Sequence, residues 1–183
     1  MYAVCWSDSL RQRMQSLNRL DPRIAVVGVG QEMRGDDAVG LIVAQRLLAI
    51  QPQHPSLLVV EGGHAPENCT GILRRFGPEL VVLVDAAALD LHPGSIQLLN
   101  WEEISGLSAT THAMPLHLLA RYLMAELNCQ VVMVGIQPID TTLGAALSSP
   151  VEKAIQEVVE GLEKLCDLVN TPPNHLSRSQ NHV

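Results

Sequence analysis

The sequence predicts an α/β three-layer sandwich around a mostly parallel sheet of about five strands. One observation behind this prediction is a series of short Val, Ile and Leu runs without polar alternation, which are typical of strands buried on both faces. The other is that the segments between these runs carry apolar residues at helical spacing. Strands that alternate with amphipathic helices form parallel sheets covered by helices on both faces.

Apolar runs bounded by turn residues mark the expected strands. These strands span 23–30, 56–63, 79–87, 94–104 and 129–138. Four of them consist mainly of apolar residues and are expected to be buried. The fourth strand contains Asn100, Glu102 and Glu103 among its apolar residues, and we expect it to be more exposed.

Helical spacing of apolar residues marks the expected helices. They span 36–50, 65–76, 115–127 and 148–169. The first begins with acidic residues and the second has an acidic first turn, which favour a helix N-terminus. Pro115 suits the first turn of the third helix, and the last helix carries one continuous apolar stripe.

The chain has 183 residues, which suits one domain with a single core. We expect the α/β domain to span 23–169. Residues 1–22 are expected to form an N-terminal extension with a short amphipathic helix, because their apolar residues recur at helical spacing. Residues 170–183 are polar and are expected to be a flexible tail.

Charge and cysteine usage narrow the class of protein. Twelve Lys and Arg against nineteen Asp and Glu give a net charge of −7, which argues against nucleic acid and anionic membrane surfaces as partners. No apolar run approaches the roughly 20 residues that span a bilayer, and the N-terminus lacks a secretory signal. The four cysteines include no C-x-x-C pair, which fits a reducing compartment. The sequence therefore predicts a cytoplasmic protein.

The segment 28–40, "GVGQEMRGDDAVG", begins like a phosphate-binding loop but departs from its chemistry. Met33 stands where the dinucleotide fingerprint requires a third glycine. Asp36 and Asp37 follow where a phosphate-binding loop carries Lys and then Ser or Thr, and their charge would repel phosphates. The two acids suit a bound cation or, alternatively, a helix cap.

Three candidate ligands follow strands or precede a helix of the predicted sandwich: Asp37, Asp85 and His112. In open α/β sheets, ligands bind outside the carboxyl ends of the strands. Two carboxylates and one imidazole form a three-ligand set with open positions for a divalent metal. The alternatives are that Asp85 caps the following turn and that His112 is an ordinary surface histidine.

Other hydrolytic signatures are missing, since the chain has neither H-E-x-x-H nor G-x-S-x-G. Cys69 with His64 or His112 could imitate a thiol peptidase. Because Cys69 falls in an expected helix, we predict that it is a buried small hydrophobe.

Five motifs resemble the hydrogenase maturation endopeptidases, the processing proteases of [NiFe] hydrogenase large subunits. They are "GVGQEMRGDDAVG", "EGGHAPEN", "LVDA", "TTHAMPL" and "VGIQP", in the order and spacing of that family. The resemblance covers about residues 23–168 and is closest to the subgroup that acts on formate-hydrogenlyase-type enzymes.

This resemblance implies a five-stranded α/β sandwich in which Asp37, Asp85 and His112 contact the metal. It implies an enzyme that removes a short C-terminal extension from the large-subunit precursor after nickel insertion, with the nickel carried by the substrate. Glu61 with the glycines that follow it, Gly62 and Gly63, is expected to recognise the substrate. Gln31 and Glu61 depart from the family, which has Asn and Asp at these positions.

Two readings of the mechanism stay open at this point. The nickel could polarise the scissile carbonyl, or it could only dock the precursor while Asp37 or Asp85 activates water. A third alternative is a nickel and precursor chaperone that keeps the fold and the ligands but does not cut.

Overall fold

The computed structural model describes residues 5–17, 19, 21–50, 54–105 and 114–170. Its centre is a five-stranded sheet in the order β2-β1-β3-β5-β4. Four strands are parallel, and β4 pairs antiparallel with β5 at one edge. The strands are β1 (Ile24–Val29), β2 (Leu57–Gly63), β3 (Leu80–Ala86), β4 (Ile96–Asn100) and β5 (Gln130–Ile136).

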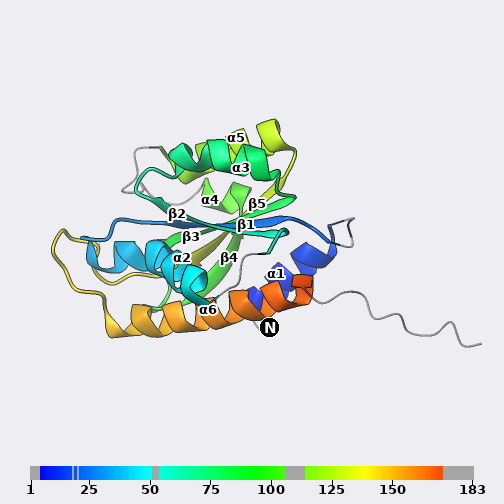
Figure 1. The fold of residues 1–183 in the computed structure, drawn as a ribbon. Coiled ribbons are helices and arrows are strands. Elements are labelled where there is room, and N and C mark those ends of the chain that lie inside the picture. Colours follow the sequence, from blue (N-terminus) through cyan, green and yellow to red (C-terminus); the bar gives the residue numbers. More distant parts are fainter. Residues whose placement is uncertain (1–4, 18, 20, 51–53, 106–113, 171–183) are drawn as a thin grey trace, which may run out of the picture.

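Helices cover both faces of the sheet, so the predicted three-layer α/β class is confirmed (Figure 1). One layer contains α1 (Trp6–Gln15), α2 (Val39–Ile50) and α6 (Ser149–Asn170). The other contains α3 (Thr70–Phe76), α4 (Trp101–Ile104) and α5 (Leu116–Leu127). Two short 3-10 helices, η1 (Gly35–Ala38) and η2 (Pro66–Cys69), precede α2 and α3.

The strands divide the core into two apolar clusters, one on each face of the sheet. Every residue of β1 is buried, and so are all but the last residue of β3 and the first of β5. The apolar stripe of α6 is buried as the helical spacing predicted. The edge strand β2 is only half-buried, so the expectation of a buried second strand was wrong.

The segment predicted as one strand, 94–104, consists of two elements. Strand β4 ends at Asn100, and α4 begins at the next residue. The backbone N–H of Asn100 donates to the Glu103 carboxylate at 2.8 Å, which is one half of a capping box. The prediction of a single strand was therefore wrong, because the acidic residues that suggested an exposed strand start a helix.

The N-terminal helix α1 packs against β4 and α6. Trp6 is 5% exposed and Leu10 1% exposed, and both belong to the core cluster on that face. The indole N–H of Trp6 donates to Glu157 at 3.2 Å. A Cβ at Gly161 would lie 2.6 Å from the indole ring, so the ring fills the space that a side chain would need.

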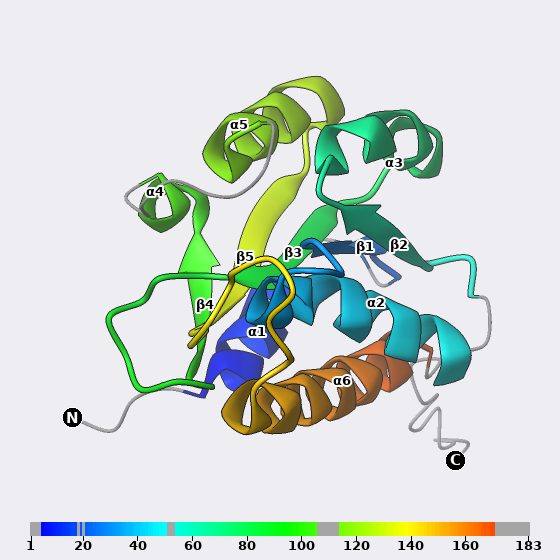
Figure 2. The ribbon, with the colours of Figure 1, turned by 90° about the vertical axis from the view of Figure 1, so that its left-hand side faces the viewer.

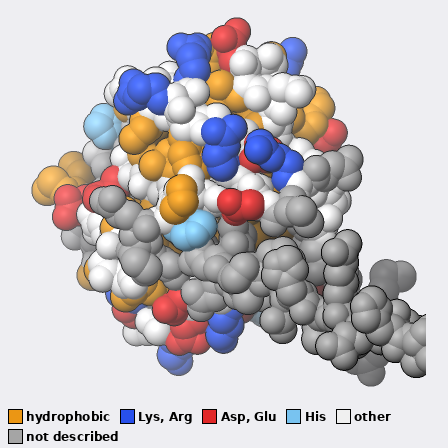
Figure 3. All heavy atoms as spheres, turned by 45° about the vertical axis from the view of Figure 1, so that its right-hand side comes forward, with side chains coloured by type: hydrophobic (Ala, Val, Ile, Leu, Met, Phe, Trp, Pro, Cys, Tyr) orange, Lys and Arg blue, Asp and Glu red, His pale blue; other side chains and the backbone are white. Residues whose placement is uncertain are grey.

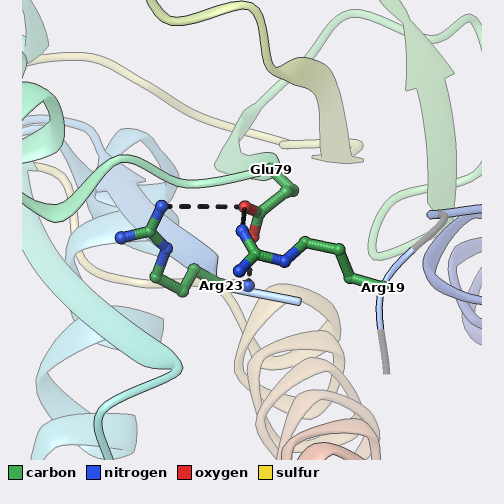
Figure 4. Close-up of polar contacts among 3 residues, drawn as sticks. All are labelled: Arg19, Arg23 and Glu79. Carbon is green, nitrogen blue, oxygen red and sulfur yellow. Dashed lines mark hydrogen bonds and ion pairs between the residues drawn. The ribbon is translucent and has the colours of Figure 1, made fainter. Parts of the chain in front are cut away.

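Residues just before β1 are tied to the start of β3 by Arg19, Arg23 and Glu79, which we call the Glu79 clasp (Figure 4). The Glu79 carboxylate accepts hydrogen bonds from the Arg19 guanidinium and from the Arg23 backbone N–H. Burial opposes ionisation, but these donors and the two guanidinium charges outweigh it, so the pKa of Glu79 lies below its ordinary value. The ionised clasp therefore fastens the chain before β1 to the sheet.

Candidate functional site

The sheet has one topological switch point, which lies between β1 and β3. The chain leaves β1 toward β2 on one side and leaves β3 toward β4 and β5 on the other. Open α/β sheets bind ligands at such a point, outside the carboxyl ends of the strands. Figure 2 views the molecule from this side, where the loops after β1, β3 and β5 lie. This side holds the carboxyl ends of the parallel strands.

Asp37 and Asp85 flank the switch point. Asp37 is in η1, which follows β1 and packs against β3, and Asp85 is the penultimate residue of β3. Their side chains are 4% and 1% exposed. Asp37 accepts a hydrogen bond from the Gln31 N–H at 3.1 Å, and Asp85 accepts one from the Ala86 N–H at 2.8 Å. The fold thus brings two buried carboxylates, 48 positions apart in the sequence, to the carboxyl ends of two neighbouring strands.

Close backbone packing explains the glycines of the loop. A Cβ at Gly40 would lie 1.9 Å from the Val84 carbonyl oxygen, so only glycine lets the first turn of α2 rest on the end of β3. Gly30 has φ +142°, and a Cβ there would lie 2.0 Å from the Asp37 carbonyl oxygen. The glycine loop therefore packs directly against the protein's own backbone.

Asp36 has a different role from its neighbour Asp37. It is 0% exposed, and its carboxylate accepts hydrogen bonds from Ile139 N at 2.8 Å, Ser148 N at 2.7 Å and Ser148 Oγ at 2.9 Å. A longer bond of 3.3 Å comes from Asp140 N. Asp36 therefore fixes the loop that follows β5 to the loop that follows β1.

His112, the third residue of the predicted trio, lies outside the described residues. Helix α5 begins four residues later, at Leu116, with Pro115 as its N-cap. Within the described part of the chain, no group of three or more His, Cys, Asp or Glu side chains could hold a metal ion. A three-residue metal site thus remains a prediction from the sequence.

Glu61, Gly62 and Gly63 end the edge strand β2 at the same edge of the sheet as Asp37. The Glu61 carboxylate is exposed and accepts a hydrogen bond from Gln45 of α2 at 3.0 Å. The register shifts at this point, because Glu61 pairs with Gly28 and Gly63 with Val29. The bulge at Gly62 turns the end of β2 beside the glycine loop.

Cys69 is buried, as the sequence predicted. Burial, and to a smaller extent the charge of Glu67, raises the pKa of its thiol. Burial also raises the pKa of Cys129 to about 11. A protonated, buried thiol is a poor nucleophile, so neither cysteine suits thiol-peptidase chemistry.

Comparisons with known proteins identify the family to which the chain belongs. The family model for hydrogenase maturation proteases matches residues 42–165. The chain is 32% identical over 136 residues to the hydrogenase 3 maturation protease of Escherichia coli K12, covering 74% of this chain and 85% of that relative. This chain belongs to the hydrogenase maturation protease family. The resemblance carried by the five motifs is confirmed, and the family model includes Asp85 but starts after Asp37.

Solved structures agree with the family assignment. The crystal structure of a [NiFe] hydrogenase maturation protease, HycI, from Thermococcus kodakarensis has a TM-score of 0.77 and 28% identity, covering 87% of this chain and 99% of that one. The solution structure of the endopeptidase HycI from Escherichia coli has a TM-score of 0.67 and 31% identity, covering 78% and 90%. The hydrogenase maturation protease fold is thus the fold of this chain, and the predicted enzyme class, an endopeptidase, stands.

None of the helices in the described residues is long and apolar enough to cross a membrane.

Proposed function

We propose that this hydrogenase maturation protease removes the C-terminal extension of a [NiFe] hydrogenase large-subunit precursor after nickel has been inserted. Family membership and the names of the relatives support this substrate. The observation that carries the proposal is the pair of buried carboxylates, Asp37 and Asp85, at the switch point. Carboxylate oxygens are ligands of divalent first-row metals, so two such side chains at the carboxyl ends of neighbouring strands suit a site that meets a cation.

The cation in this proposal is nickel carried by the precursor, met by Asp37, Asp85 and His112. Imidazole and carboxylate groups are accepted ligands of divalent first-row metals. Three ligands from separate loops make a weaker site than a closed cage of four thiolates. The trio would therefore fill open positions on a metal that the precursor already holds, and affinity would arise when protease and precursor meet.

Both catalytic schemes fit this arrangement of side chains. In one scheme the substrate's nickel acts as a Lewis acid on the scissile carbonyl. In the other, nickel only docks the precursor, and Asp37 or Asp85 takes a proton from the attacking water. In either scheme the protein contributes two acceptors whose positions are fixed by β3 and η1 before the substrate arrives.

The test compares nickel-loaded and nickel-free precursor, with cleavage followed by intact mass and by mobility. We expect the wild-type protein to cut only the loaded precursor, and Asp37→Asn and Asp85→Asn to cut neither. The isosteric amide keeps the shape of the side chain while removing its charge. Cleavage at the wild-type rate by a folded variant would remove that residue from the site. Binding of the loaded precursor without any loss of mass would instead support the non-cleaving chaperone.

Metal analysis of the purified protein tests where the nickel resides. We expect less than one equivalent of bound metal in the isolated protein. Stoichiometric zinc, together with efficient cleavage of nickel-free precursor, would contradict substrate-borne nickel and make this protein a resident-metal peptidase.

A further inference from the structure

The loops beside the predicted site expose large apolar side chains. Met33 and Leu143 are each 68% exposed, and Ile139 is 57% exposed. Met33 is in the loop after β1, and the other two are in the loop after β5. Single exposed apolar residues are ordinary, but a group on adjoining loops indicates an interaction site. We call Met33, Ile139 and Leu143 the apolar patch.

Hydrogen bonds hold the two loops of the apolar patch together. The Gly144 N–H donates to the Met33 carbonyl at 2.7 Å, and the Arg34 side chain donates to the Thr141 carbonyl at 3.1 Å. The buried Asp36 carboxylate adds its bonds to the loop after β5. The exposed side chains are therefore presented on a fixed frame, so little ordering entropy opposes binding there.

The charges around the apolar patch have one dominant sign. In the described segments at the ends of β1, β2, β3 and β5, the only Lys or Arg is Arg34, whose Nε–H donates to the Thr141 carbonyl. The acidic residues of these segments are the exposed Glu32, Glu61, Asp90 and Asp140, the partly exposed Glu67, and the buried Asp36, Asp37 and Asp85. Lys and Arg side chains gather elsewhere, for example in the upper half of the face in Figure 3, the half in which α3 and α5 lie in Figure 1.

We propose that the apolar patch docks a segment of the precursor polypeptide that carries apolar side chains flanked by Lys or Arg. This inference rests on the proposed function, since it names the chemistry of the substrate next to the cut. Apolar side chains of that segment would pack on Met33, Ile139 and Leu143, while its cations would face the acidic surroundings. A second copy of this chain is a poorer occupant, because it would bring the same negative charge to the contact.

The experiment measures steady-state cleavage of nickel-loaded precursor by a triple variant, Met33→Ser, Ile139→Ser and Leu143→Ser. Because these side chains are exposed, the variant should keep the wild-type melting temperature. We expect KM to rise about tenfold, with kcat within about twofold of wild type. The matched control is Leu48→Ser, which removes a side chain 48% exposed near the end of α2, at the opposite edge of the sheet, and should leave KM unchanged.

A second arm tests the charge. Glu32 is exposed in the loop of the apolar patch, and Glu32→Gln should raise KM less than the triple variant does while weakening its dependence on salt. The inference is overturned if the triple variant keeps the wild-type KM, or if Leu48→Ser raises KM equally. It is also overturned if light scattering shows a wild-type dimer that the triple variant dissociates, because the patch would then belong to a second copy.

Failure of the proposed function gives a different result. If the wild-type protein binds the immobilised precursor without cutting it, the protease assignment fails, and the docking inference is decided by binding alone. A triple variant that binds as tightly as wild type would then overturn it, and weaker binding would support it. A wild-type protein that neither cuts nor binds the precursor would overturn both.

Discussion

Truncation of the two adjacent aspartates of the glycine loop, Asp36 and Asp37, is expected to affect different properties of the protein. The Asp36→Ala substitution should lower the free energy of unfolding, whereas Asp37→Ala should keep the fold and stop precursor processing. The contrast follows from the reach of their hydrogen bonds, because Asp36 joins two loops through four donors, whereas the Gln31 N–H that donates to Asp37 belongs to the same loop as Asp37.

The size of the Asp36→Ala effect can be worked from these bonds. A hydrogen bond to a charged group contributes about 1.5–3 kcal/mol, and removing the acceptor also leaves the N–H groups of Ile139 and Ser148 without it. Three of the four bonds are 2.7–2.9 Å long and one is 3.3 Å. Since neighbouring bonds are not additive and water can enter, we expect a loss of about 3–5 kcal/mol. For a domain of this size that lowers Tm by roughly 10 °C.

The assay is urea and thermal denaturation of both variants, with precursor processing measured on the folded fraction. Asp37→Ala should lose clearly less stability than Asp36→Ala, because the bond from Gln31 to Asp37 joins no second loop to the glycine loop. Equal destabilisation by the two substitutions would refute this reasoning. So would an Asp36→Ala protein with the wild-type midpoint, because the buried bonds would then contribute nothing net.

Four further predictions address the remaining site and the frame. Asp85→Ala and His112→Ala should each abolish processing while leaving a folded protein, which a cooperative urea transition checks. The Glu61→Asp variant should process the precursor at nearly the wild-type rate, whereas Glu61→Ala should raise KM for the precursor without removing nickel recognition. Loss of nickel recognition with intact precursor binding would contradict this role of Glu61. Because the pKa of Glu79 is lowered in the folded state, its ionised form stabilises the fold at pH values above the ordinary pKa of 4.5. This stabilisation is lost as pH falls through the lower folded-state pKa. The Tm difference between wild type and Glu79→Gln should therefore shrink between pH 6 and pH 3. Trp6→Ala should cost about 3–5 kcal/mol in urea unfolding, because the 5% exposed indole fills a core site.

Strand identity could be predicted from the sequence because the parallel strands are almost continuously apolar. What could not be predicted was how each strand is covered. Strand β2 begins with an aliphatic run like those of its neighbours, yet it is half-buried because it lies at the edge of the sheet. Edge position depends on the strand order, which periodicity does not contain.

The end of β4 shows a signal that was present and was misinterpreted. Asn100 followed three residues later by Glu103 has the spacing of a capping box. Polar residues after an apolar run suit an exposed strand as well, but here the pair starts α4. Local capping chemistry outweighed the apolar run that preceded it.

The sequence could place Asp37 and Asp85 at strand ends, but it could not separate Asp36 from Asp37. Both acids begin the same helical segment and have the same intrinsic chemistry. What separates them is a set of donors 103 to 112 positions away, which only the folded chain brings to Asp36. The apolar patch depends on such contacts as well, since the N–H that donates to the Met33 carbonyl belongs to Gly144, in the loop after β5.

Long-range bonds of this kind bear on how the protease would distinguish a loaded precursor from an empty one. If the precursor binds as proposed, a nickel-free precursor contacts the apolar patch alone, and a nickel-loaded precursor also offers its metal to Asp37 and Asp85. Two weak contacts on one rigid frame reinforce each other, because the first raises the effective concentration of the second. Asp36 sets the spacing between them, since its carboxylate fixes the loop that carries Ile139 to the segment that carries Asp37. Selectivity for the loaded precursor is then a difference between two affinities and does not require a tight metal site in the protease itself.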